Sequence, residues 1–564
     1  MSVSPGRSAG EQRPLLSDGD TPKNSSKGHH NLAGLPSLQF RLIFLGVWLC
    51  AFLGSLDGTV VATILSDIGS SFDASNQASW LGTAYLLSVC CFTPMYGRVS
   101  DMIGRRGALL IALTSFTIGT VLCGVAPSMW FLIAARCIAG VGGGGVLSVG
   151  VIIMSDLVDL RRRGLYQGYM NIAFGLGGAL GGPLGGFCSD KFGWRTAFLI
   201  QIPLLLITII LVYTQVRIPH PKTPAPPSSS NLPNAEQSTL RSALGRIDYL
   251  GSLTLTLAVA SLLVPISIKT ASTKASGEDY RWSDPIVWGL LAASVVMTTI
   301  FVLVEGFYAP EPILPLQLLT RRTPIAVALS SLIMVINIFS ILYNVPLFFS
   351  AVRLESSSVA GAHLLPYSIM IGAGSLSIGW LMQRTGKYWW ASLISASIIV
   401  VSSGMLATWR VDSPEWITWV AQMPSGFGYA GVLTSSLVAL MTNVTREGKG
   451  EQAVATSMAY LFRNIGQVLG VSLSAAIMQG ILSTSLKRLI TGPDASRIIY
   501  TIRHSTSSIR DLAPEHLQAA VQAYEHALHV IFIFNLVLSV INVLVLTIVK
   551  EDEMPDQRGE SLDD

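Results

Sequence analysis

Apolar residues gather in blocks of about 20 along most of this chain, and short polar connections separate the blocks. A helix of about 20 residues is about 30 Å long, which matches the hydrocarbon core of a bilayer. The pattern therefore predicts an all-α polytopic membrane protein that lies in a lipid bilayer. The 14 expected spans are 40–65, 79–97, 108–126, 129–152, 165–187, 194–216, 246–268, 285–306, 325–350, 358–382, 388–409, 415–441, 453–480 and 527–549.

Composition agrees with this class. Apolar residues make up 50% of the chain and charged residues 12%, and the mean hydropathy is +0.54. A soluble chain would carry roughly twice that share of charge. The net charge of +4 is spread over the loops without a dense basic stripe, so we expect no nucleic-acid partner. The six cysteines lie in or beside apolar blocks without C-x-x-C spacing, which favours packing over a metal site.

Basic residues choose the orientation, because cytosolic loops carry an excess of Lys and Arg. The basic residues of the short loops fall mainly on one predicted face: Arg98, Arg105, Arg106, Arg161, Arg162, Arg163, Arg321, Arg322, Arg384, Lys387, Arg446 and Lys449. Both termini are therefore expected in the cytosol. The predicted organisation is a disordered tail (1–39), a six-helix half (40–216), a Pro/Ser linker (217–245), two additional helices (246–306), a second six-helix half (307–549) and a short tail (550–564).

The loop after the second block is short and charged: Gly97-Arg-Val-Ser-Asp101-Met-Ile-Gly104-Arg105-Arg106-Gly107. Charge at the bilayer centre costs roughly 2.5–3.5 kcal/mol per residue, so this run must lie at a membrane surface. It resembles the loop between helices 2 and 3 of the major facilitator superfamily, where acidic and basic residues form a clasp. The resemblance implies a conformational clasp of Gly97, Asp101, Arg105 and Arg106, with Asp101 paired to a basic residue of its loop or to a helix N-terminus.

Asp57 and Arg136 are charged residues inside apolar blocks, in Leu56-Asp-Gly-Thr-Val and Ala135-Arg-Cys-Ile-Ala-Gly140. Such residues face a polar interior or a partner, because lipid does not solvate them. Both patterns resemble motifs of the 14-span drug:H⁺ antiporters, and the resemblance implies a role in proton coupling. The alternatives are a helix–helix hydrogen bond for Asp57 and an arginine that extends to the membrane surface for Arg136.

A glycine-rich run in the block at 165–187 contains Gly178, Gly182, Pro183 and Gly186. Glycines allow close backbone packing and proline removes a helix hydrogen bond, so this helix should kink and pack tightly. The run resembles the antiporter motif of the same superfamily. Generic packing of small residues is the alternative.

Weaker candidates lie in the second half. Gly379-Trp-Leu-Met-Gln-Arg384-Thr-Gly-Lys387 resembles a degenerate repeat of the clasp loop without its acid, which favours two pseudo-equivalent halves. Polar residues inside spans line the substrate cavity or bind neighbouring helices, and the sequence leaves both open: Asn337, Tyr343, Asn344, Arg463, Asn464 and Gln467.

The family resemblance covers residues 40–550 and is strongest to the fungal vacuolar basic amino-acid transporters. It implies exchange of protons for Lys, Arg or His, with Asp57 as the buried acid for a cationic substrate. The alternatives are plasma-membrane efflux of drugs or siderophores, and a nutrient sensor that has lost transport. We find no nucleophile elbow, phosphate loop or metal cluster, so no enzyme and no cofactor are expected.

The N-terminal tail holds an acidic dileucine pattern with Glu11, Leu15 and Leu16. Sorting adaptors that direct cargo to vacuoles or lysosomes bind such patterns, which act as addresses and do not contribute to the fold. The pattern predicts a vacuolar membrane location with a cytosolic adaptor as partner. The plasma membrane is the alternative location.

Overall fold

A computed structural model describes residues 35–158, 160–217, 249–271, 280, 283–308, 316–445, 451–491 and 494–551. Within these ranges every regular element is helical, which confirms the all-α expectation. The elements are α1 (Ser37–Ser71), η1 (Ser75–Gln77), α2 (Ser79–Gly124), α3 (Met129–Leu157), α4 (Leu160–Phe192), α5 (Trp194–Leu199), α6 (Ile202–Gln215), α8 (Tyr249–Ala271), α9 (Pro285–Phe307), α10 (Leu316–Leu319), α11 (Arg322–Ala351), α12 (Ser357–Ala362), α13 (Leu365–Thr385), α14 (Trp389–Ala407), α15 (Glu415–Val420), α16 (Met423–Thr445), α17 (Glu451–Leu489), α18 (Ala495–His504), η2 (Ser507–Asp511) and α19 (Pro514–Thr547).

Local sequence sets several of these boundaries. Ser128 caps the start of α3, and its hydroxyl accepts a hydrogen bond from the Phe131 N–H. Gly386 ends α13 in the left-handed conformation, with φ of 67°, which glycine adopts without steric cost. Gly104 interrupts α2 with φ of 81°, so the two halves of this long helix are separate rods. The break falls inside the charged loop that the sequence places at a membrane surface.

Among the described residues, 12 helices are long and apolar enough to cross a membrane. They are Ser37–Ser71, Met102–Gly124, Met129–Met154, Tyr166–Phe192, Trp194–Gln215, Pro285–Phe307, Arg322–Ala351, Ser357–Thr385, Trp389–Ala407, Glu415–Asn443, Met458–Leu489 and Pro514–Thr547. The sequence predicted 14, and the other two are the segments 79–97 and 246–268. The segment 79–97 is helical within α2 and the described residues of 246–268 are helical within α8, where the apolar helix Leu253–Ile266 is shorter than the 12 spans.

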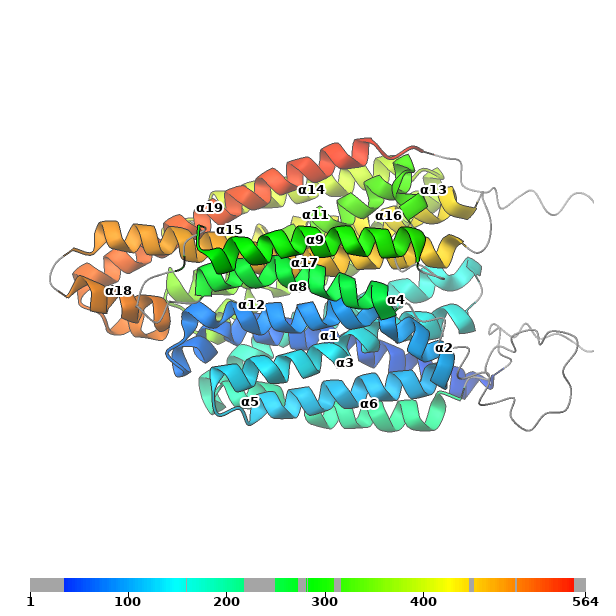
Figure 1. The fold of residues 1–564 in the computed structure, drawn as a ribbon, viewed down its shortest axis with the longest axis horizontal. Coiled ribbons are helices and arrows are strands. Elements are labelled where there is room, and N and C mark those ends of the chain that lie inside the picture. Colours follow the sequence, from blue (N-terminus) through cyan, green and yellow to red (C-terminus); the bar gives the residue numbers. More distant parts are fainter. Residues whose placement is uncertain are drawn as a thin grey trace, which may run out of the picture.

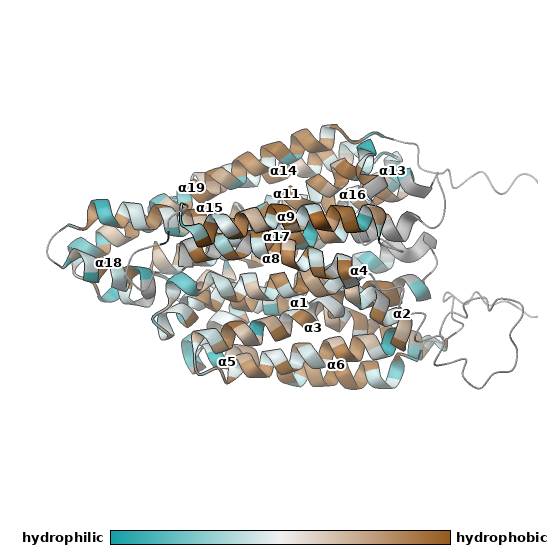
Figure 2. Ribbon diagram, viewed as in Figure 1, coloured by the Kyte–Doolittle hydropathy of each residue, from teal (hydrophilic) through white to brown (hydrophobic). Residues whose placement is uncertain are grey.

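The long helices lie side by side in one bundle, with α1 to α6 along one edge and α11 to α19 along the other (Figure 1). Helices α8 and α9 pack together, and α8 also contacts α2 and α17. Hydrophobic residues run along the outer helices, and hydrophilic residues are more frequent near the helix ends and in α18 (Figure 2). Large apolar side chains such as Ile210, Trp288 and Leu544 are exposed on the outside, where lipid would cover them.

Helix α18 covers one end of the bundle, which we call the α18 end (Figure 1). The sequence leaves open whether the long connection 481–526 is folded. In the structure α17 continues to Leu489, and α18, η2 and the start of α19 occupy most of the remainder. Two hydrogen bonds tie this cap to the rest of the bundle: Thr506 to Ser75 of η1 at 3.4 Å, and the Arg510 guanidinium to the Glu355 carbonyl, between α11 and α12, at 2.7 Å.

Candidate functional site

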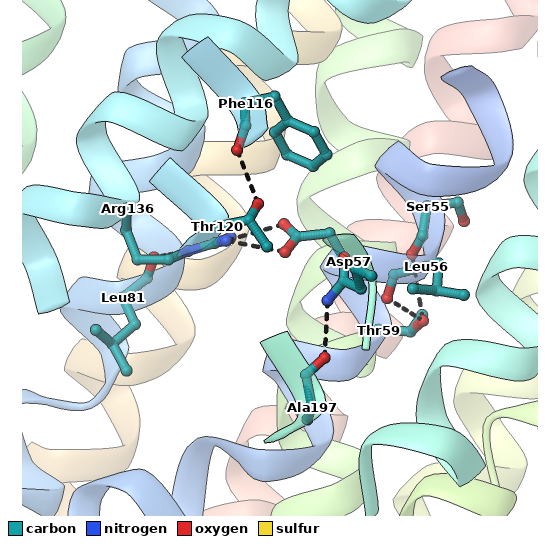
Figure 3. Close-up of polar contacts among 10 residues, drawn as sticks. Ser55, Leu56, Asp57, Thr59, Leu81, Phe116, Thr120, Arg136 and Ala197 are labelled. Atoms are coloured by element: carbon teal, nitrogen blue, oxygen red, sulfur yellow. Dashed lines mark hydrogen bonds and ion pairs between the residues drawn. The ribbon is translucent and has the colours of Figure 1, made fainter. Parts of the chain in front are cut away.

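Asp57 and Arg136, which are distant in sequence, form a buried ion pair between α1 and α3 (Figure 3). Each residue has 0% of its surface exposed. Arg136 Nη1 donates to both carboxylate oxygens of Asp57, at 3.1 and 2.9 Å. Its Nε lies 3.5 Å from the Leu81 carbonyl, and the guanidinium lies 4.1 Å from the centre of the Tyr85 ring. The two formal charges therefore compensate one another inside the bundle.

This pair behaves as a unit. Removal of one partner from a buried ion pair leaves an uncompensated charge and costs about 3–5 kcal/mol. A proton that reaches Asp57 would have the same electrostatic consequence, because it would cancel the negative charge beside Arg136.

A cavity of about 80 Å³ lies between α1 and α2 on one side and α11 and α17 on the other, and neither Asp57 nor Arg136 lines it. Tyr343 forms part of its wall and packs against Gly82 of α2, where an added Cβ would lie 2.6 Å from the phenol oxygen. Tyr343 is also close enough to Asp57 and Arg136 to interact with them electrostatically. Tyr343 thus connects the cavity wall with the ion pair.

The described residues that line the cavity include no charged side chain. Its polar lining comes from hydroxyl and amide groups, among them Thr63, Asn344 and Gln479. The Thr63 Oγ1 and Gln479 Oε1 atoms are buried without a hydrogen-bond partner. Buried polar atoms normally have one, so these two oxygens are available to a polar ligand.

The remaining polar candidates of the second half do not gather at this cavity. Asn337 of α11 donates to the Asn535 carbonyl of α19 at 2.7 Å. Asn464 is buried on α17 and Gln467 is half-buried, and neither lines the cavity. Arg463 lies over the Tyr460 ring, with 4.8 Å between the guanidinium carbon and the ring centre. The sequence-predicted residues therefore fall into separate groups.

The glycines of α4 face two different neighbours. An added Cβ at Gly177 or Gly181 would lie 2.2 or 2.5 Å from a carbonyl oxygen of α1, that of Phe52 or of Leu56. At Gly182 and Gly186 it would lie 2.4 and 2.3 Å from carbonyl oxygens of the α12 segment. Gly178 lies between the Ser55 and Ser368 hydroxyls, each 3.1 Å from its added Cβ. Helix α4 is continuous through Pro183, and its glycines let its backbone approach α1 on one side and the α12 segment on the other.

Two carboxylates reinforce this contact at the α18 end. Asp67 of α1 accepts hydrogen bonds from the Ser189 hydroxyl of α4 and, at 2.7 Å, from the Ser357 hydroxyl of α12. Asp190 of α4 accepts from the Ser358 hydroxyl and, at 3.0 Å, from the Ser358 N–H. Together with the close contact at Gly186, these hydrogen bonds hold α1 and α4 against α12 at this end.

The structure gives Arg105 a partner outside its own loop. Its Nε donates to Asp156 of α3 at 2.7 Å, and its Nη1 donates to the Ser100 hydroxyl at 3.0 Å. Arg106 lies over the Tyr213 ring at 4.3 Å, and nothing lies within 4 Å of an added Cβ at Gly97. The side chain of Asp101 lies outside the described residues, and so do the sorting residues Glu11, Leu15 and Leu16. Their predicted roles remain predictions.

Sequence reasoning missed Tyr85, Asp156 and the Asp67 and Asp190 contacts. Asp156 ends the apolar block that contains Arg136, and an acid at such an edge was a usable signal for a clasp partner. Tyr85 is one aromatic residue among many in apolar blocks, so no comparable signal pointed to it. Among the residues that the structure describes, no three His, Cys, Asp or Glu side chains come together to hold a metal ion.

Comparisons with known proteins agree on one family. The model of the Major Facilitator Superfamily matches residues 47–471. The chain is 38% identical over 491 residues to the multidrug resistance protein fnx1 of Schizosaccharomyces pombe, over 86% of this chain and 88% of that protein. It is 31% identical over 506 residues to the vacuolar basic amino acid transporter 1 of Saccharomyces cerevisiae, over 84% and 83%.

Among solved structures, the chain resembles a bacterial homologue of the human lysosomal transporter Spinster in an inward-facing, unoccupied conformation. The TM-score is 0.59 and the identity 13%, over 91% of this chain and 98% of that one, so the likeness concerns the fold alone. Together with the helical bundle, these matches confirm the expected family: the chain belongs to the Major Facilitator Superfamily and is a multi-pass membrane transport protein for small molecules.

Proposed function

We propose that this protein is a proton-coupled antiporter of the vacuolar membrane that moves the basic amino acids Lys, Arg and His into the vacuole. The observation that carries the proton coupling is the fully buried Asp57–Arg136 pair. The similarity to a vacuolar basic amino acid transporter supports the substrate class and the location. Adaptor binding to the Glu11, Leu15 and Leu16 tail is part of the same proposal.

The proposed topology has 14 spans, with 79–97 and 246–268 added to the 12 apolar helices. Its support is that the described residues of both segments are helical and that α8 packs against α9. We place the first half at 40–216 and the second at 307–549. We place the short basic loops at the end opposite α18, and so assign that end to the cytosol and the α18 end to the vacuolar lumen.

In this proposal the proton enters from the acidic lumen and leaves to the cytosol. Each unit of pH difference supplies about 1.4 kcal/mol per proton. Protonation of Asp57 removes the charge that holds Arg136, and repacking of α1 and α3 couples this event to opening and closing at the α18 end. Asp57 is already neutralised by Arg136 in this structure, so a cationic substrate meets no free carboxylate at this pair.

Uptake into isolated vacuolar vesicles tests this function. With an acidic lumen, we expect vesicles that contain the protein to accumulate labelled lysine, arginine and histidine. An agent that collapses the pH difference should reduce accumulation about tenfold for each unit of pH lost, if one proton is exchanged for each substrate. Vesicles without the protein are the control. Accumulation that is unaffected by the pH difference would contradict proton coupling.

A second candidate function is export of drugs or siderophores across the plasma membrane, and the 38% identity to a multidrug resistance protein favours keeping it. The uncharged lining of the cavity also suits neutral molecules. Drug resistance as the sole phenotype, together with a location only at the cell surface, would favour this function over vacuolar loading.

The sorting residues provide a separate test of location. Changing Leu15 and Leu16 together to Ala removes the apolar contacts that an adaptor needs, and we expect part of the protein to move to the plasma membrane. Fluorescence microscopy of a tagged chain measures the distribution. The matched control changes Leu35 and Leu38 to Ala, outside the acidic dileucine pattern but in the same N-terminal region. Wild-type distribution of the Leu15/Leu16 variant would contradict adaptor sorting.

A further inference from the structure

Arg463 is a charged residue inside a membrane-spanning helix, within the segment Met458–Leu489 of α17. Its surroundings are aromatic. The guanidinium lies over the Tyr460 ring at 4.8 Å, and the hydroxyls of Tyr429 and Tyr460 are its hydrogen-bonding neighbours. The Tyr429 ring in turn lies 6.4 Å from the Tyr367 ring. Residues of α13, α16 and α17 thus form a tyrosine-lined site around one guanidinium.

The guanidinium of Arg463 differs from those of Arg136 and Arg105 in its partners. Arg136 is paired with Asp57 and Arg105 with Asp156, whereas Arg463 has no carboxylate partner among the described residues. Its Nε atom is buried and has no hydrogen-bond partner. Phenols remain neutral near pH 7, so the tyrosines orient the cation without compensating its charge. An uncompensated cation within a membrane span is costly, and the described side chains around Arg463 supply no anion.

We propose that Arg463 binds the α-carboxylate of the transported amino acid. This inference rests on the proposed function and specifies how the substrate is recognised. A guanidinium presents N–H donors in a planar fork that matches the two oxygens of a carboxylate, and its free Nε–H provides one of them. The Tyr429 and Tyr460 hydroxyls can donate further hydrogen bonds to the same group. Stacking over the Tyr460 ring holds the Arg463 guanidinium in one plane before the substrate binds.

The chemical consequence is a requirement for the carboxylate. A site with a positive charge and a set of N–H and O–H donors binds an anion strongly, and an amine without a carboxylate leaves Arg463 uncompensated. Lysine should therefore be recognised, whereas lysine amide and cadaverine should be poor ligands, because one has a neutral carboxamide and the other lacks the group. A purely structural Arg463, which only holds α16 against α17, would give no such discrimination.

The test is competition against labelled lysine uptake in vesicles that contain wild-type protein, Arg463→Lys or Arg463→Gln. For the wild type, we expect lysine amide and cadaverine to compete at least about 100-fold more weakly than lysine. Arg463→Gln should raise the KM for lysine about 100-fold and abolish the preference for lysine over its amide. Arg463→Lys, which keeps the charge and loses the fork, should recover part of both. Arg410→Gln removes an exposed arginine and serves as the matched control.

Two results would overturn the assignment while the proposed function stands. One is a wild-type protein that takes lysine amide or cadaverine as readily as lysine, which needs no variant and so does not depend on folding. The other is an Arg463→Gln variant that loses maximal rate but keeps the wild-type preference for lysine over lysine amide. Absence of lysine uptake by the wild type would overturn the proposed function itself, and the carboxylate assignment with it.

Discussion

Asp57→Asn is expected to reduce substrate accumulation driven by a pH gradient at least 100-fold, to about background. The amide has nearly the shape of the carboxylate but carries no charge and does not titrate, so the step that couples protonation to repacking is lost. The substitution also leaves Arg136 as an uncompensated cation between α1 and α3, at a cost of about 3–5 kcal/mol. We therefore expect less folded protein as well, measured by detergent gel filtration.

A second variant separates coupling from folding. Asp57→Asn combined with Arg136→Gln removes both charges, so it should restore much of the folded protein and none of the pH-driven accumulation. Exchange of labelled for unlabelled substrate without a gradient should survive in the double variant. Asp73→Asn is the control, because it makes the same chemical change at an exposed residue just beyond the end of α1. A double variant that folds and still responds fully to the pH gradient would contradict the assigned role of the pair.

The second large effect is expected at Gly186. An added Cβ there would lie 2.3 Å from the Ser357 carbonyl oxygen and 2.5 Å from two backbone carbons of α12. Backbone cannot rotate away as a side chain can, so Gly186→Ala must separate α4 from α12 at the α18 end. Overpacking of this kind costs about 1–3 kcal/mol, which shifts a two-state equilibrium roughly 5- to 150-fold away from the closed arrangement. We expect lysine uptake to fall by a similar factor.

Labelling from the α18 side reports this opening directly. Ser79 lines the cavity, and a cysteine introduced at this position should react faster with an impermeant maleimide in the Gly186→Ala background. Gly168→Ala is the matched control, since it lies on the same helix with nothing within 4 Å of the added Cβ. Equal uptake and equal labelling in the two backgrounds would show that the close contact does not hold this end shut.

The sequence identifies the charged residues of the site, but it does not identify the residues with which they pair. Asp57 and Arg136 attract notice because each is a charge in an apolar block, but their pairing joins residues 79 positions apart and depends on how α1 and α3 pack. The partner of Arg105 is 51 positions away for the same reason. Periodicity identifies an amphipathic or apolar helix, and it does not specify which helix lies beside it.

The weakest predictions concern segments of mixed polarity. The connection 481–526 has no apolar block, so its pattern did not reveal that α17 and α19 extend beyond the bundle and that α18 covers its end. Of the two further predicted spans, 79–97 lies in α2 and the described part of 246–268 lies in α8, but neither is among the 12 helices that are long and apolar enough to cross a membrane. The glycines of α4 were predicted to pack closely, while their division between α1 and α12 required the fold.

The compensated charges of Asp57 and Arg136 have a consequence for membrane voltage. A neutral pair experiences no net force in an electric field, whereas a single charge gains or loses about 2.3 kcal/mol for each 100 mV that it crosses. In the proposed cycle, the carrier with a proton on Asp57 and the carrier with bound lysine each hold one additional positive charge. Voltage therefore acts equally on both forms. Exchange of one proton for one lysine would move no net charge, and the pH difference and the lysine concentrations would set the accumulation whatever the membrane potential.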